Sequence, residues 1–251
     1  MSRIDRYVED PWRIISFLNN HGLLNSLSDQ SYISLAYRAV FKKKLNLADP
    51  KTYNEKLQWL KLFDHNPLYP TLVDKYEVKR YVAEKIGQQY IVPTIGVWDS
   101  FDAIDFSALP EQFVLKCTHD SGGFAICRDR KTFDIEEARR KIETSLRTNY
   151  YKHGREWPYK NIPRRIIAEP YLTDETGEGL RDEKFFCFNG EPKVMFIVSD
   201  REHEARNDYF DMDYTHLPFE NGHPNADKTP TKSEGFEEMK RLAATLSEGM
   251  P

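Results

Sequence analysis

The sequence predicts an α+β or mixed α/β protein whose second half contains antiparallel strand pairs. Apolar residues in about the first 65 positions recur at helical spacing, and polar capping residues precede several of these runs. Two strand-like runs flank a glycine pair between Phe113 and Cys127, and two more flank Asn189-Gly190, a dipeptide that strongly favours a tight hairpin turn. Helices followed by a strand, a hairpin, a helix and a second hairpin are typical of this class.

Two helices are predicted in the N-terminal part. The first covers residues 30–44, where one face is apolar: Tyr32, Ala36, Ala39 and Val40. The second begins at Thr52-Tyr53-Asn54-Glu55, a capping box whose side chains bond the free amides of the first turn, and it continues to Phe63. Pro67 and Pro70 interrupt the helical pattern after it.

A third helix is predicted from Asp74 to Gly87. It opens on Asp74-Lys75-Tyr76-Glu77, a second capping-box pattern with Asp74 as the N-cap. Its inward residues are Val78, Val82 and Ile86. Residues 91–98 then read as a strand, and an acidic loop follows over 99–110.

The most informative segment is the hairpin from Phe113 to Cys127. Two apolar runs flank a polar stretch that holds Gly122-Gly123, and Lys116 lies near the end of the first run. Glycines let backbone N–H groups approach phosphate oxygens closely, and a lysine supplies a positive charge beside them. The segment therefore indicates a hairpin that folds over a nucleotide triphosphate. The alternative is an ordinary hairpin with a Gly-Gly turn.

The rest of the chain continues the mixed pattern. A third capping-box pattern, Asp134-Ile135-Glu136-Glu137, opens a helix with an inward stripe of Ile135, Ala138, Ile142 and Leu146. A basic and aromatic loop follows over 150–160. Strands are predicted at 165–172, 183–188 and 193–198, and a last helix at about 234–247 with Phe236, Met239, Leu242 and Leu246 inward.

Composition narrows the class of protein. With 251 residues, 30% charged and 39% hydrophobic, the chain is typical of a globular protein with a real core. Its net charge of −4 does not favour non-specific nucleic-acid binding. The sequence shows no signal peptide and no transmembrane segment. Its cysteines lie in apolar runs without metal-ligand spacing, which predicts reduced core residues of a cytoplasmic protein: Cys117, Cys127 and Cys187.

Five motifs occur in order: DKYEVKRYV, FVLKCTHDSGGF, RIIAEPYL, DEKFFCFNGEPK and SDR. Together they resemble the ATP-grasp superfamily, most closely its TupA-like branch, over about residues 50–251. The resemblance implies two α+β subdomains whose antiparallel sheets clamp ATP, preceded by a helical N-terminal segment. It suggests a helical region over 1–65, a pre-ATP-grasp segment over 66–112, a lid subdomain with the glycine hairpin over 113–172, and an incomplete C-terminal subdomain over 173–251.

The same resemblance implies roles for residues near the phosphates. Lys75 matches a helix-start lysine that reaches the phosphates in relatives, and its alternative role is a solvated first-turn lysine. Lys116 matches the strand lysine on the α- and β-phosphates; a lysine inside an apolar run is also unusual without a partner. Ser121, Gly122 and Gly123 match the flexible loop over the phosphates.

Further implied contacts concern adenine, ribose and the transferred phosphoryl group. Glu169, Tyr171 and Leu172 match the hinge that frames adenine. Asp182 and Lys184 match an acidic-x-basic pair near the ribose and phosphates. Arg201 matches the arginine that stabilises the γ-phosphate or acylphosphate, and with Lys184 it is the implied catalytic residue. The alternative for these last three is a surface ion-pair cluster.

The chain departs from the family pattern at its end. Relatives carry their Mg²⁺ ligands on two strands after the last helix, and this sequence stops at Glu248-Gly249-Met250-Pro251, so no metal ligand is identified. We expect a fragment of a longer ligase, or else a relative that binds without catalysing. The acidic residues of a turn-like segment are interpreted as turn formers rather than substitute ligands: Asp208, Asp211 and Asp213.

The function implied by the resemblance is an ATP- and Mg²⁺-dependent carboxylate–amine ligase that acts through an acylphosphate. Its substrates would be a uronic-acid or peptidyl carboxylate of a surface polysaccharide, teichuronopeptide or capsule, and an amine from an amino acid or amino sugar. The loop 150–160 could bind a sugar acid or simply dock on the core. Two alternatives remain: a glycosyltransferase, a label often given to such sequences although Asp211-Met212-Asp213 is a weak match, and a catalytically silent nucleotide-binding module.

Overall fold

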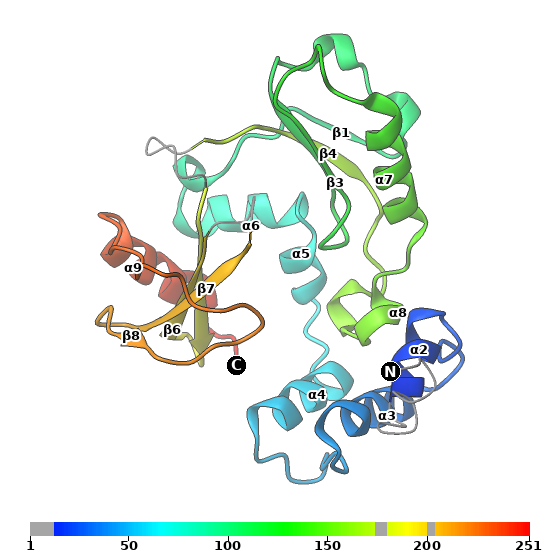
Figure 1. The fold of residues 1–251 in the computed structure, drawn as a ribbon, viewed down its shortest axis with the longest axis vertical. Helices are drawn as coiled ribbons and strands as arrows, with labels where there is room; N and C mark the ends of the chain where they lie inside the picture. Colours follow the sequence, from blue (N-terminus) through cyan, green and yellow to red (C-terminus); the bar gives the residue numbers. More distant parts are fainter. Residues whose placement is uncertain (1–12, 174–179, 200–203) are drawn as a thin grey trace. The chain divides into compact units, whose positions relative to one another are not determined.

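The computed structural model describes residues 13–173, 180–199 and 204–251, drawn as helices and strands in Figure 1. The chain divides into two compact units: unit 1 combines Met1–Val78 with Thr94–Glu169, and unit 2 combines Lys79–Pro93 with Pro170–Pro251. Each unit contains a four-stranded sheet, and the predicted α+β class with antiparallel pairing is confirmed. No helix in the described ranges has the length and apolar character needed to cross a bilayer.

The sheet of unit 1 has the strand order β1-β4-β2-β3. Its strands are β1 (Gly96–Trp98), β2 (Phe113–Cys117), β3 (Phe124–Cys127) and β4 (Ile166–Pro170). Helix α7 (Ile135–Arg147) covers one face, where Leu115 and Cys117 of β2 are buried in its core (Figure 1). Because side chains alternate along a strand, Val114 and Lys116 lie on the opposite face of the sheet.

Helix α7 follows the predicted pattern with two differences. Asp134 caps it by accepting a hydrogen bond from the Glu137 N–H, but the Glu137 carboxylate pairs with Lys141 and does not return to close a capping box. Ala138 is buried as predicted, whereas Ile135 in the first turn is exposed.

In the described residues before α6, the chain forms α2 (Arg13–Asn20), α3 (Asp29–Phe41), α4 (Tyr53–Phe63) and α5 (Tyr69–Val73). The capping box that opens α4 is confirmed, because the Thr52 and Glu55 side chains bond each other's backbone N–H groups. Helix α5 was not predicted. Pro70 lies in its first turn, where the missing N–H of proline costs no helical hydrogen bond.

The N-terminal helices share a small core of Leu24, Tyr32, Ile33, Tyr37 and Leu45. This core explains why α3 forms where the apolar spacing predicts it. Val40 was predicted on the buried face and is instead 70% exposed, because it lies in the last turn of α3 and the cluster does not cover it.

The basic and aromatic segment 150–160 is not simply a loop. It contains α8 (Tyr151–Gly154) and the short 3₁₀ helix η4 (Trp157–Tyr159), and it docks on the N-terminal helices. The buried Arg155 donates to the Asn25 carbonyl at 3.1 Å and lies 4.7 Å from the Tyr32 ring centroid. The Tyr151 hydroxyl bonds Asp29. These contacts show that the segment docks on the N-terminal helices, and its binding of a sugar acid stays a prediction.

Helix α6 (Glu77–Ile86) follows a cap at Asp74. The Asp74 carboxylate accepts hydrogen bonds from the N–H groups of Tyr76 and Glu77 at 2.8 and 3.3 Å, as predicted for an N-cap. The Glu77 side chain bonds Arg165 and not the Asp74 backbone, so the predicted capping box does not form here either.

The predicted strand over 91–98 is confined to β1. Short 3₁₀ helices occupy much of the surrounding chain: η1 (Gln88–Tyr90), η2 (Phe101–Ala103) and η3 (Phe106–Ala108). Pro93 has no N–H to give to a strand ladder, which is consistent with pairing that starts only at Gly96.

The sheet of unit 2 has the order β5-β6-β7-β8. Its strands are β5 (Asp182–Phe188), β6 (Glu191–Ser199), β7 (Arg206–Asp211) and β8 (His216–Leu217), and α9 (Phe236–Ser247) packs on β5 and β6. The predicted turn between β5 and β6 is confirmed, because Asn189 and Gly190 have φ of 52° and 80°, as a type I′ turn requires. Phe236 of α9 completes a core with Met195, Ile197 and Phe210.

Strand β7 corrects the interpretation of residues 208–213 as turn residues. Asp208 is a fully buried strand residue that accepts hydrogen bonds from His216 at 3.0 Å and from the Ala226 N–H at 3.1 Å. Asp211 ends the strand, and its carboxylate accepts the N–H groups of Asp213 and Thr215 in the turn that follows, so the turn interpretation is wrong for Asp208 only. These aspartates organise the β7–β8 connection.

Candidate functional site

The candidate site of unit 1 lies around the turn 118–123 that joins β2 to β3. Lys116 of β2 pairs in register with Phe124 of β3, so the two side chains share the face of the sheet that α7 does not cover. Phe124 and Ile126 are exposed on that face. The open face therefore combines an ammonium group with apolar side chains, a composition that suits a nucleotide.

Lys116 and Glu169 were predicted separately, and the fold brings them together. The Lys116 Nζ lies 2.5 Å from the Glu169 Oε2, across the adjacent strands β2 and β4. The side chain of Lys116 is 36% exposed and that of Glu169 only 8%. Lys116 thus has the ion-pair partner that is expected for a lysine within an apolar run, and part of its side chain remains exposed to solvent.

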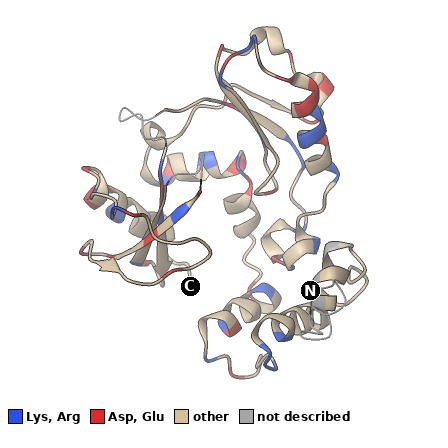
Figure 2. Cartoon of the chain, viewed as in Figure 1, with Lys and Arg blue, Asp and Glu red and all other residues tan. Residues whose placement is uncertain are grey.

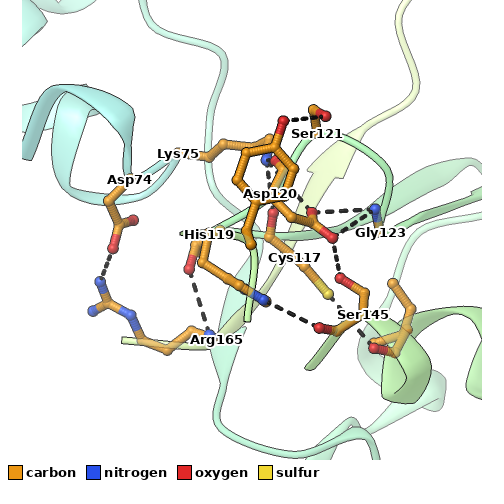
Figure 3. Close-up of polar contacts among 12 residues, drawn as sticks. Asp74, Lys75, Cys117, His119, Asp120, Ser121, Gly123, Ser145 and Arg165 are labelled. Atoms are coloured by element: carbon orange, nitrogen blue, oxygen red, sulfur yellow. Dashed lines mark hydrogen bonds and ion pairs between the residues drawn. The ribbon is translucent and has the colours of Figure 1, made fainter. Parts of the chain in front are cut away.

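Asp120 organises the turn from inside (Figure 3). Its carboxylate accepts the Gly123 N–H at 3.1 Å and the Ser145 hydroxyl of α7. Sequence reasoning missed this role, although an aspartate three residues before a glycine is a known signal for a side-chain-to-backbone turn. Asp120 thereby connects the turn to the helix that covers the sheet.

Lys75 supports the same turn from the segment before α6. Its Nζ donates to the Cys117 carbonyl at 2.9 Å and to the Asp120 carbonyl, and lies 4.0 Å from the Asp120 carboxylate (Figure 3). Burial lowers the pKa of Lys75, and the Asp120 charge partly opposes this shift. The structure shows Lys75 bound to the turn's backbone rather than freely solvated. Its contact with phosphates stays a prediction.

An ion-pair cluster positions Lys75, and sequence reasoning did not find it. The Arg165 Nη2 donates to the buried Asp74 carboxylate at 2.8 Å and to Glu77 at 3.0 Å. Arg165 immediately precedes β4, and the Thr118 N–H bonds its carbonyl at 2.9 Å. The cluster ties the start of α6, the strand β4 and the turn into one arrangement.

His119 is another buried part of the turn. Its Nε2 lies 3.2 Å from the Ser145 carbonyl, and burial lowers its pKa. A neutral ring that donates from Nε2 leaves Nδ1 as an acceptor, and that atom has no hydrogen-bond partner in the described ranges. The ring fills space behind the turn rather than facing solvent.

The outer rim of the turn is exposed. The Ser121 hydroxyl lies 2.9 Å from the Tyr150 hydroxyl, and both Ser121 and Gly122 are exposed. Within the described part of the chain, the backbone N–H groups of Ser121 and Gly122 have no acceptor. Two consecutive open N–H donors on a braced turn are suited to bind an anion.

The two glycines of the turn have different structural roles. A Cβ on Gly123 would lie 2.1 Å from the Ser145 Oγ, whereas a Cβ on Gly122 would meet nothing within 4 Å. Neither has the positive φ of a primed hairpin turn. Gly123 is therefore required for close packing against α7, and Gly122 leaves the outer rim unobstructed.

We expect Gly123→Ala to destabilise the protein by about 1–3 kcal/mol, because the added methyl group must displace Ser145 and the Asp120 carboxylate. Gly122→Ala is the matched control and should change the free energy of unfolding by less than about 0.5 kcal/mol. Urea denaturation of both variants measures the difference. Equal stability of the two variants would contradict the packing role of Gly123.

The remaining predicted residues belong to unit 2 or lie outside the described residues. Tyr171 and Leu172 follow β4 directly, and Leu172 is exposed. Asp182 and Lys184 of β5 form an ion pair of 2.7 Å, with both side chains nearly half exposed. Arg201 lies outside the described residues. The Asp182–Lys184 pair matches the surface ion pair considered as an alternative, and its role toward a nucleotide stays a prediction.

A metal site was not identified from the sequence. Among residues 13–173, 180–199 and 204–251, no three His, Cys, Asp or Glu side chains are grouped so that they could hold a metal ion. The carboxylates of Asp208 and Asp211 are occupied by the hydrogen bonds of the β7–β8 connection. The described residues therefore offer no preformed group of three protein ligands for Mg²⁺.

Comparison with known proteins gives one result. A family model described as TupA-like ATPgrasp matches residues 55–251, which include both sheets and every predicted site residue. No curated protein and no solved structure shows significant similarity to the chain.

Proposed function

The chain belongs to the TupA-like ATP-grasp family, and from that premise we propose that it is an ATP-dependent carboxylate–amine ligase. The observation that carries the proposal is the braced turn 118–123. Lys75 and Asp120 hold it from within, while the N–H groups of Ser121 and Gly122 remain open to an anion. ATP-grasp proteins bind ATP, and this turn has the donors that a triphosphate needs.

The roles of the residues in unit 1 follow from their chemistry. Lys116 offers a positive charge from an open sheet face, and a triphosphate bound there would draw its Nζ away from Glu169 or share it. Glu169 would then be available to accept a hydrogen bond from the amino group of adenine or from a ribose hydroxyl. The N–H groups at Ser121 and Gly122 would bond phosphate oxygens at no cost in lost protein hydrogen bonds.

Separate roles are proposed for residues of unit 2. The backbone groups near Tyr171 and Leu172 would frame adenine, and Asp182 with Lys184 would lie toward ribose and phosphates. Arg201 would stabilise the transferring phosphoryl group through its forked guanidinium. ATP, when bound, supplies the γ-phosphoryl group that turns a carboxylate into an acylphosphate, which an amine then attacks with release of phosphate.

The substrate class belongs to the same proposal. We expect a uronic-acid or peptidyl carboxylate of a surface polysaccharide, teichuronopeptide or capsule, and an amine from an amino acid or amino sugar. The expected Mg²⁺ has no ligand set among the described residues, so no step is assigned to it.

The proposal is tested by ligand-dependent stability followed by turnover. ATP at about 100 times its dissociation constant should stabilise the protein by about 2.7 kcal/mol in a thermal-shift assay, and UDP-sugars should not. Release of ADP and phosphate should then require both a carboxylate and an amine. Stabilisation by a UDP-sugar alone would favour a glycosyltransferase, and ATP binding without acceptor-dependent release would favour a silent nucleotide-binding module.

A further inference from the structure

The C-terminal end of α3 presents apolar side chains to solvent. Val40 is 70% exposed and Phe41 is 39% exposed, although the earlier turns of the same helix bury Tyr32, Ile33 and Tyr37. Adjacent exposed valine and phenylalanine side chains at a helix end are unfavourable in water. A partner surface that covers these two side chains would therefore be favourable.

A run of lysines surrounds this apolar end. Lys42, Lys43 and Lys44 follow Phe41 directly and are all exposed. Lys42 has φ of 57°, so the chain turns sharply at the helix end, and the Lys42 Nζ bonds the Ala39 carbonyl at 2.8 Å. The turn and this bond keep the Lys42 side chain at the end of α3, and Lys43 and Lys44 follow it directly in the chain.

Two lysines of this run, Lys43 and Lys44, have unpaired charges within the described part of the chain. In the described ranges no carboxylate lies within ion-pair distance of Lys43 or Lys44, and the nearby Asp49 pairs with Lys51 at 2.7 Å. The whole chain carries a net charge of −4, so this basic segment contrasts with the protein as a whole. Figure 2 shows the basic residues in blue where α3 ends.

We propose that the end of α3, formed by Val40, Phe41 and Lys42 to Lys44, docks on the surface of an anionic phospholipid bilayer. Valine and phenylalanine would enter the boundary between headgroups and acyl chains, and the lysines would remain at the level of the anionic headgroups. Membrane-surface helices combine these two properties, apolar side chains and adjacent basic residues.

The composition of this surface disfavours two other binding partners. A second copy of this chain in a symmetric dimer would place the two lysine runs against each other, which like charges disfavour. A nucleic acid or other polyanion would use the lysines but would leave Val40 and Phe41 without an apolar partner. The anionic bilayer accounts for both halves of the surface.

Co-sedimentation with vesicles tests the proposal. The intact chain should bind vesicles of phosphatidylcholine mixed with anionic phosphatidylglycerol and should not bind phosphatidylcholine alone. Each lysine near an anionic surface contributes about fivefold in affinity, so Lys43→Glu combined with Lys44→Glu should weaken binding by at least about 25-fold. Val40→Ser combined with Phe41→Ser should weaken it as well, at low and high salt.

The matched control reverses two exposed lysines elsewhere in unit 1, Lys131→Glu with Lys152→Glu, and should bind vesicles like the parent. Circular dichroism of each variant confirms that the fold is kept. The proposal is overturned if the parent does not bind anionic vesicles. It is also overturned if the control variant loses as much binding as the variant with Lys43→Glu and Lys44→Glu. Binding to heparin that is as tight as vesicle binding and indifferent to Val40→Ser and Phe41→Ser would instead assign the surface to a polyanion.

Discussion

Lys116→Met should weaken ATP binding by about 10- to 100-fold, the loss expected when one charge-assisted hydrogen bond to a phosphate is removed. Methionine keeps a long apolar side chain of similar size, so packing next to Phe124 changes little. The substitution removes only the ammonium on the open sheet face. Isothermal titration with ATP below the melting temperature of the variant measures the loss.

This variant needs a control because Lys116 also pairs with Glu169. Removing the ammonium leaves the Glu169 carboxylate, which is 8% exposed, beside an apolar group, and we expect a separate loss of about 1–3 kcal/mol in stability. Lys131→Met removes one exposed lysine away from the site and should affect neither property. If Lys116→Met binds ATP as tightly as the parent, Lys116 is not a phosphate ligand.

The largest expected loss of stability comes from Asp74→Ala. The Asp74 carboxylate is buried, caps α6 and accepts a hydrogen bond from Arg165 at 2.8 Å. Removing it leaves the Arg165 guanidinium, whose side chain is 17% exposed, with only the more exposed Glu77 as an ion-pair partner, and it also removes the cap of α6. We expect a combined loss of about 3 kcal/mol. Urea denaturation measures the change in the free energy of unfolding.

One further variant distinguishes the contribution of the helix cap to stability from that of the ion pair, and a second serves as a control. Asp74→Asn retains a side-chain oxygen for the cap and loses the charge, so it should fall between the parent and Asp74→Ala. Asp99→Ala removes an exposed aspartate and should cost less than about 0.5 kcal/mol. A loss from Asp74→Ala no greater than that from Asp99→Ala would show that the cluster with Arg165 and Glu77 contributes little to stability.

Sequence patterns predicted the elements whose signals are local. The Thr52–Glu55 capping box and the Asn189-Gly190 turn were found as predicted, because each depends on residues within one turn of chain. Strand β7 was missed because its aspartates and asparagine are typical of turns. Asn207 and Asp208 are buried in a strand only because β6, His216 and the segment near Ala226 pair with them.

The candidate site likewise contains residues that local sequence signals identified and contacts that only the fold creates. Lys116 and the Ser121–Gly123 turn were identifiable from the apolar runs and the glycine pair, and the family resemblance added Lys75 and Glu169. The partners within unit 1 were not identifiable: Glu169 lies 53 positions from Lys116, and Arg165 lies 91 from Asp74. Neither spacing carries a local signal, so the long-range pairings follow only from the fold.

The sequence by itself determined the hairpins at Gly122-Gly123 and Asn189-Gly190, because turn chemistry acts over a few residues, and its five ordered motifs carried the resemblance to the family. Only the tertiary structure decided which side chains brace the glycine hairpin and which remain open. Asp120 turns inward because Ser145 of α7 donates to its carboxylate, and Lys75 turns inward because the carbonyls of the turn accept its ammonium hydrogens. The N–H groups of Ser121 and Gly122 remain open because no acceptor packs against them in the described part of the chain.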